Sequence, residues 1–199
     1  MLVSGLVDNR SIIHLDLSCN RIGDKGARAI SKLLESRSVL NRLDLNDNMI
    51  HAEGGKALAR SLPNAPSLMS LNLSLNSIGD SGVRAICHVL QKATNVRNLN
   101  LAANGATESS ISEITSLIGS NRTILKIDLS SNEFGNGEIT KEIAEVLTTA
   151  YSEGVSMIRS LDVRSCGMDP EEIYKIEDLI RGKTEDAILA KITQQDEVK

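Results

Sequence analysis

The chain has 199 residues and a net charge of −4, which gives enough length for a sizeable core and does not favour nucleic acid as a partner. Its apolar runs are shorter than the roughly 18 residues that a membrane span needs. Its three cysteines are far apart and odd in number, so we expect free thiols in a reducing compartment. These features predict an intracellular protein that neither binds nucleic acid nor enters a membrane.

One short phrase recurs along the chain. It reads LDLSCN at 15–20, LDLNDN at 43–48, LNLSLN at 71–76, LNLAAN at 99–104, IDLSSN at 127–132 and LDVRSC at 161–166. The first five copies are 28 residues apart and the sixth follows after 34. A repeat of this length that begins with L-x-L-x-x-N/C is the leucine-rich-repeat signature.

Each copy predicts a short strand followed by a helix. The Leu-x-Leu alternation is typical of a strand with one buried face. The amide of the asparagine can satisfy backbone groups where the chain turns, and Cys166 takes this place in the last copy. Apolar residues then recur at helical spacing, and Asp24 and Asp80 are predicted to be the N-caps of their own helices.

Stacked units of this kind must curve, because strands lie about 4.8 Å apart whereas packed helices need roughly 9–10 Å. The predicted fold class is therefore α/β: a leucine-rich-repeat solenoid, shaped as an open horseshoe with a concave parallel sheet and outer helices. Its core is a continuous strip, and solenoids of this kind mostly present extended surfaces to other macromolecules.

The repeats are predicted to occupy residues 1–181. Leu2 and Leu6 lie 28 residues before Ile30 and Leu34, so residues 1–11 are predicted to be an incomplete repeat. We therefore expect this chain to be the C-terminal part of a longer protein. After Cys166 the register continues, but the next strand phrase is missing. A helix that starts at Thr184 is predicted instead, so residues 182–199 are expected to form a capping helix and a frayed tail.

The sequence offers little chemistry. The three histidines, His14, His51 and His88, lie in different contexts without nearby metal-ligand partners, and we interpret each as a solvated or edge residue. The chain contains no phosphate-binding loop, no dinucleotide-binding motif and no nucleophile elbow. We therefore expect no catalytic residue, no cofactor, no metal and no small-molecule substrate.

One candidate partner-binding set is the middle position of each strand, which alternation places on the concave face. It comprises Asp16, Asp44, Asn72, Asn100, Asp128 and Asp162. We expect these side chains to be exposed and to receive a basic segment of a partner, with Arg42 and Lys126 offsetting part of the charge. An ordinary solvated inner face is the alternative interpretation.

A second candidate set lies toward the C-terminus. The fifth repeat is six residues longer, near Asn136 and near Tyr151, and insertions in repeat proteins often map to binding faces. Tyr174 takes a position that earlier repeats give to polar outward residues, so it is expected to be partly exposed. Residues 169–199 hold nine acidic and five basic side chains, which adds Glu171 and Glu172 to the set. The alternative is that Tyr174 only shields the closing edge.

The 28-residue period and the IGD-x-G start of residues 22–26 resemble the ribonuclease-inhibitor-type leucine-rich repeats, over residues 2–181. Within that class, residues 14–28, 70–78 and 161–164 resemble a leucine-rich-repeat subunit of the nexin–dynein regulatory complex of motile cilia. The resemblance implies a non-catalytic scaffold in the axoneme, with other linker subunits as partners. Two alternatives stay open: a GTPase-activating solenoid of the Ran-regulator type, and the sensor region of a larger innate-immune or inhibitor protein.

Overall fold

The computed structural model describes residues 6, 9–36, 39–92, 94–135 and 137–196. Strands and helices alternate along the chain. The strands are β1 (His14–Asp16), β2 (Arg42–Asp44), β3 (Ser70–Asn72), β4 (Asn98–Asn100), β5 (Lys126–Asp128) and β6 (Ser160–Asp162). The helices are α2 (Gly23–Glu35), α3 (Ala52–Ser61), α4 (Gly79–Leu90), α5 (Ile111–Ser120), α6 (Gly137–Ser152) and α7 (Pro170–Asp196), with short 3₁₀ turns η1 (Leu62–Asn64) and η2 (Glu108–Ser110).

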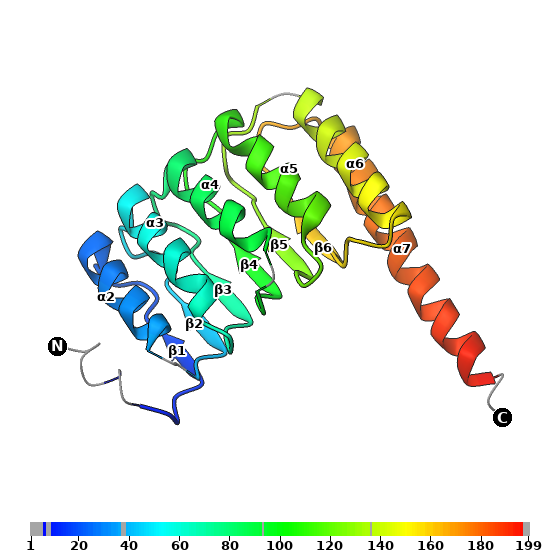
Figure 1. The fold of residues 1–199 in the computed structure, drawn as a ribbon. Coiled ribbons are helices and arrows are strands. Elements are labelled where there is room, and N and C mark those ends of the chain that lie inside the picture. Colours follow the sequence, from blue (N-terminus) through cyan, green and yellow to red (C-terminus); the bar gives the residue numbers. More distant parts are fainter. Residues whose placement is uncertain (1–5, 7–8, 37–38, 93, 136, 197–199) are drawn as a thin grey trace.

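The six strands form one parallel sheet in chain order. His14 pairs with Arg42, and each later strand pairs 28 residues on, except that Lys126 pairs with Ser160 after 34. Figure 1 shows the strands on the inner side of an open arc and the helices on its outer side. The predicted solenoid of six parallel strands is confirmed.

The core is a continuous strip between the sheet and the helices. The second leucine of the repeated phrase is fully buried in the middle repeats, at Leu45, Leu73, Leu101 and Leu129. Leu17, in the first strand, is only partly buried. The alternation of the phrase therefore works as predicted, because each inward leucine packs between its sheet and its helix.

The predicted asparagine ladder is present. Asn48, Asn76, Asn104 and Asn132 are buried. The side-chain amide of Asn76 donates to the carbonyls of Leu45 and Leu73, at 2.9 Å each. In the last rung the thiol of Cys166 donates to the carbonyl of Leu129 at 3.1 Å. Each rung thus fastens its repeat to the one before it.

The residue before each rung adopts a left-handed backbone conformation. Its φ lies between 51° and 58° at Cys19, Asp47, Leu75, Ala103, Ser131 and Ser165. This conformation is unfavourable for most side chains, and glycine occupies none of these six positions. After β2 to β5 this strained turn is therefore followed by a buried asparagine whose hydrogen bonds stabilise it.

The predicted helix caps are wrong in their direction. Asp24 lies in the first turn of α2, whose N-cap position is Ile22 and has no side-chain cap. Its Oδ1 instead accepts from the backbone N–H of His51 (2.8 Å) and of Gly54 (2.9 Å), at the start of α3. Asp80 likewise accepts from the backbone N–H of Thr107 at 2.7 Å. Asp24 therefore caps α3 of the following repeat, and Asp80 holds Thr107, the residue whose own side chain caps η2.

The predicted second helix from Thr184 is also wrong. Residues 170–196 form one unbroken helix, and the boundary predicted after residue 181 falls inside it. Figure 1 shows its C-terminal half extending past the end of α6 and away from the arc. The capping role of residues 182–199 therefore stays a prediction. Within the described residues, no helix combines the length and the apolar character that crossing a bilayer requires.

Candidate functional site

The middle row of the concave face is mostly shielded from solvent. Asp16 is exposed, Asp44 is buried with 9% of its surface accessible, and the other four members of the row are partly buried. The prediction of an exposed acidic row is therefore wrong beyond the first strand. The short spacing of parallel strands lets each polar side chain cover its neighbour.

Amide groups take up much of the hydrogen-bonding capacity of this row. The Nδ2 of Asn72 donates to both carboxylate oxygens of Asp44, at 3.0 Å each. The Nδ2 of Asn100 donates to Oδ2 of Asp128 at 3.1 Å. These two carboxylates therefore have fewer free acceptor positions for a partner's cation than the sequence predicted, although a hollow of about 310 Å³ lies on the same face.

The same residues also end their strands. Oδ1 of Asp16 accepts from the backbone N–H of Ser18 at 2.9 Å and from its hydroxyl at 2.7 Å, and these bonds lower the pKa of the Asp16 carboxyl. Asp44, Asn72, Asn100, Asp128 and Asp162 each accept from the N–H two residues on. A short polar residue is therefore needed here to form the turn, independently of any partner.

The last member of the row differs from the others. Asp162 accepts from Nε of Arg164 at 3.0 Å, and these two side chains also form an ion pair. The Arg164 guanidinium lowers the pKa of the Asp162 carboxyl. Arg42, by contrast, lies 3.9 Å from Asp44. The tightest charge pair of the concave face therefore stands at its C-terminal end.

A groove follows that end of the sheet. It has a volume of about 440 Å³ and lies between β6 and α7. Its lining combines Arg159, Asp162 and Arg164 on the β6 side with Glu177, Ile180, Arg181 and Thr184 on α7. We call this groove, together with the exposed face of α7 around Tyr174, the C-terminal flank.

The sheet is open along this flank. In the preceding repeat the N–H groups of Leu129 and Ser131 donate to the carbonyls of Asp162 and Arg164. Their equivalents just after β6 are the N–H groups of Val163 and Ser165, which bind nothing in the part of the chain that the structure describes. Val163 is buried, whereas Ser165 is exposed, so the N–H of Ser165 is the donor that an extended partner segment beside the groove could reach.

Tyr174 stands beside the groove. Its side chain is 60% exposed, as predicted, and the Arg181 guanidinium lies 5.9 Å from the centre of its ring. Glu171 is exposed in the first turn of α7, and Glu172 pairs with Lys175 at 2.6 Å. The structure therefore brings Tyr174, through Arg181, close to the end of the concave row at Asp162.

Tyr151 lies elsewhere and does a different task. It is partly buried on α6, and its hydroxyl donates to the carbonyl of Ile158 at 2.8 Å. Burial raises the pKa of the Tyr151 phenol to about 12. Tyr151 therefore fixes the position of the segment that leads into β6, and its hydroxyl is already bonded and so is not available to a partner.

Sequence reasoning missed two members of the flank, Arg164 and Arg181. Arg164 had a signal, because the equivalent positions hold Ser18, Asn46, Ser74, Ala102 and Ser130, and a charge appears only in the last repeat. Arg181 had none, since its importance depends on how α7 lies against β6. Among the described residues, no cluster of three or more histidine, cysteine or acidic side chains could hold a metal ion.

The sequence model of the family described as Leucine Rich repeat matches residues 8–31, 38–59, 64–87 and 120–137. The chain carries leucine-rich repeats, and it folds as a leucine-rich-repeat solenoid. The family model leaves residues 88–119 and 138–199 unmatched, and the first of these segments has the same strand register and the same asparagine rung as its neighbours.

A solved structure titled Leiomodin-1 Actin-Binding Site 2 (ABS2) is similar to this chain. The TM-score is 0.62 and the sequences are 18% identical, over 76% of this chain and 88% of that one. At this identity the likeness shows the fold alone. The sequence has no significant match among curated proteins.

Proposed function

We propose that this protein is a non-catalytic scaffold that binds other proteins through its C-terminal flank. The observation that carries the proposal is the groove between β6 and α7, about 440 Å³ in volume, beside an exposed tyrosine. Exposed aromatic residues next to arginines are typical of interface hot spots. The other repeats present their concave polar groups already bonded to one another.

The flank suits a partner segment with backbone and side-chain hydrogen-bonding capacity. The unused N–H group of Ser165 can donate to a carbonyl of that segment, as the equivalent N–H of Ser131 does inside the sheet. Tyr174 offers an apolar ring, while Glu177 and Arg181 offer both charge signs. Because rim charges mainly set the association rate, binding is expected to weaken as ionic strength rises.

The finer proposal concerns the assembly. The sequence resembles the T-complex-associated testis-expressed 1 protein, subunit five of the nexin–dynein regulatory complex, at residues 14–28, 70–78 and 161–164. On that basis we propose a role in the linker between axonemal doublet microtubules, with other linker subunits as partners. Its place in the cell would then be the axoneme of a cilium or flagellum, where it would help to regulate dynein.

The test is affinity capture from an extract of motile cilia with two variants of equal charge change. The flank variant carries Tyr174→Ala, Glu171→Lys and Glu172→Lys. The control carries Glu35→Lys and Glu145→Lys, two exposed positions on α2 and α6. The proposal expects linker subunits on the unmodified protein and on the control, and their loss from a folded flank variant. Equal capture by both variants would refute the flank, and capture without linker subunits would refute the axonemal role.

A further inference from the structure

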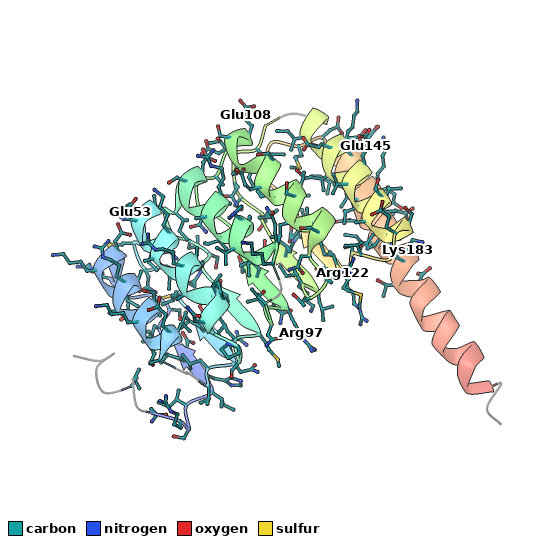
Figure 2. The ribbon with its side chains drawn as sticks, in the orientation of Figure 1. Glu53, Arg97, Glu108, Arg122, Glu145 and Lys183 are labelled. Atoms are coloured by element: carbon teal, nitrogen blue, oxygen red, sulfur yellow. The ribbon has the colours of Figure 1, made fainter. Side chains whose placement is uncertain are left out.

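Three arginines gather at the edge of the solenoid where the strands begin. Arg97, Arg122 and Arg159 line a hollow of about 380 Å³, together with Leu125 and Met157 and two polar residues, Asn95 and Thr123. Figure 2 shows Arg97 and Arg122 at this edge, with Glu53 and Glu108 near the opposite one. We call this hollow the arginine pocket.

The repeat register places these side chains together. Arg97, Leu125 and Arg159 occupy the same position just before β4, β5 and β6. The two arginines are therefore separated by two strand spacings, roughly 10 Å, with Leu125 between them. The N–H of Leu125 donates to the carbonyl of Arg97, and the N–H of Arg159 to that of Leu125, at 2.8 Å each. The floor of the pocket is thus a continuation of the sheet.

Two side-chain hydrogen-bond networks fix the segments that carry Arg122 and Met157. Asn121 is buried, and its Oδ1 accepts from the N–H groups of Thr123 (2.8 Å) and Ile124 (2.7 Å), so the turn that carries Arg122 is fixed. The Tyr151 hydroxyl binds the carbonyl of Ile158, which lies between Met157 and Arg159. The pocket is therefore preformed, which lowers the ordering cost of binding.

The positive charge of the pocket is not balanced locally. None of the ion pairs formed within the described residues involves Arg97, Arg122 or Arg159. The C-terminus of α5, next to Arg122, supplies a partial negative charge of about 0.5, well below the three positive charges. In a chain with a net charge of −4, such a concentration of arginines marks an anion-binding surface.

The lining also selects among anions. Met157 is 45% exposed and Leu125 is partly exposed, so apolar surface lies among the guanidinium groups. A small inorganic anion makes no use of that surface, whereas an acidic peptide with an apolar side chain contacts both. We propose that the arginine pocket binds an acidic, leucine-containing peptide segment of a protein partner.

This inference rests on the proposed function, because both take the ligand to be another protein. The arginine pocket is nevertheless a different surface from the C-terminal flank. Arg159 stands at the border between the arginine pocket and the groove of the C-terminal flank. The flank variant leaves all three arginines in place. It therefore separates the two sites, because peptide binding in the arginine pocket should survive in it.

The experiment measures direct binding of synthetic peptides to the whole chain at low ionic strength. The probe is a fluorescent peptide of alternating Glu-Glu-Leu units, and the comparison peptide has glycine in place of leucine. The pocket variant carries Arg97→Gln, Arg122→Gln and Arg159→Gln. The matched control carries Arg28→Gln, Arg60→Gln and Arg84→Gln, all exposed on the outer helices.

The proposal expects the leucine peptide to bind the unmodified protein and the control within about twofold, and the pocket variant about tenfold more weakly. The glycine peptide should bind less tightly than the leucine peptide. Equal binding of the leucine peptide to both variants, or no saturable binding to the unmodified protein, would overturn the proposal. Pyrophosphate that binds as tightly and displaces the peptide would make this a site for small anions and overturn it as well.

Discussion

The side-chain oxygen of Asn76 accepts a hydrogen bond from the backbone N–H of Asn48 at 3.1 Å, one repeat away. The same oxygen accepts from the N–H of Ile50 at 2.9 Å, while its amide nitrogen donates to carbonyls on both repeats. One buried side chain therefore satisfies backbone groups of two turns. This relationship repeats at Asn132 and Asn104, at 3.0 Å.

Replacing Asn76 with leucine should lower the free energy of unfolding by about 2–4 kcal/mol, because several buried backbone groups lose their partner at once. Urea denaturation followed by circular dichroism measures the loss. Asn20→Leu is the matched control, since Asn20 is exposed and its side chain bonds, among the described residues, only the carbonyls of Leu17 and Ser18 in its own repeat. Equal losses in the two variants would contradict the ladder.

Asp24→Ala should destabilise the protein by about 1 kcal/mol, since it removes the carboxylate that caps α3. The neighbouring Lys25→Ala, at an exposed position of the same turn, should change stability by less than about 0.5 kcal/mol. Hydrogen exchange locates the effect. Faster exchange is expected at the N–H groups of His51 and Gly54 in α3, and acceleration confined to α2 would refute capping across the repeats.

Leu75→Asn should stabilise the protein by about 0.5–1 kcal/mol. Leu75 has a φ of 54° and is 57% exposed, so its side chain contributes little packing while its backbone is strained. Asparagine adopts this conformation at a lower cost than alanine, because its short polar side chain can bond locally. Leu75→Ala is thus the control, and a melting temperature no higher for Leu75→Asn than for Leu75→Ala would show that the strain is unimportant.

The three cysteines should differ in reactivity. Cys19 is exposed, whereas Cys87 and Cys166 are buried. Burial raises the pKa of the Cys87 thiol to about 12 and also raises that of Cys166, so both remain protonated at pH 8. A thiol reagent should modify one cysteine in the folded protein and all three in guanidinium. Rapid modification of two or more in the folded protein would contradict this assignment.

Much of the fold was predictable because equivalent residues of a regular repeat take equivalent positions in the structure. The spacing of Asn48, Asn76 and Asn104 predicted both the strand register and the buried ladder. The contacts between repeats were harder. Whether Asp24 caps α2 or α3 depends on how far neighbouring helix starts are offset, and periodicity alone does not contain that distance.

The candidate site was less predictable for the same reason. The exposure of Tyr174 followed from the polar residues at equivalent positions in earlier repeats. The shielding of Asp44 by Asn72 and the gathering of Arg97, Arg122 and Arg159 did not, because they depend on side chains from different repeats meeting in space. The pattern of one repeat predicts whether a residue lies on the inner or the outer face. It does not predict which side chains of other repeats that residue contacts.

The most direct test of the central claim is hydrogen–deuterium exchange of the protein alone and in complex with a captured partner. A partner docked on the C-terminal flank should slow exchange in peptides that cover residues 159–184, with the exposed N–H group of Ser165 included. Exchange over β2 to β4 should change little. Protection confined to the concave strands β2 to β4, with residues 159–184 unaffected, would contradict the proposed docking surface.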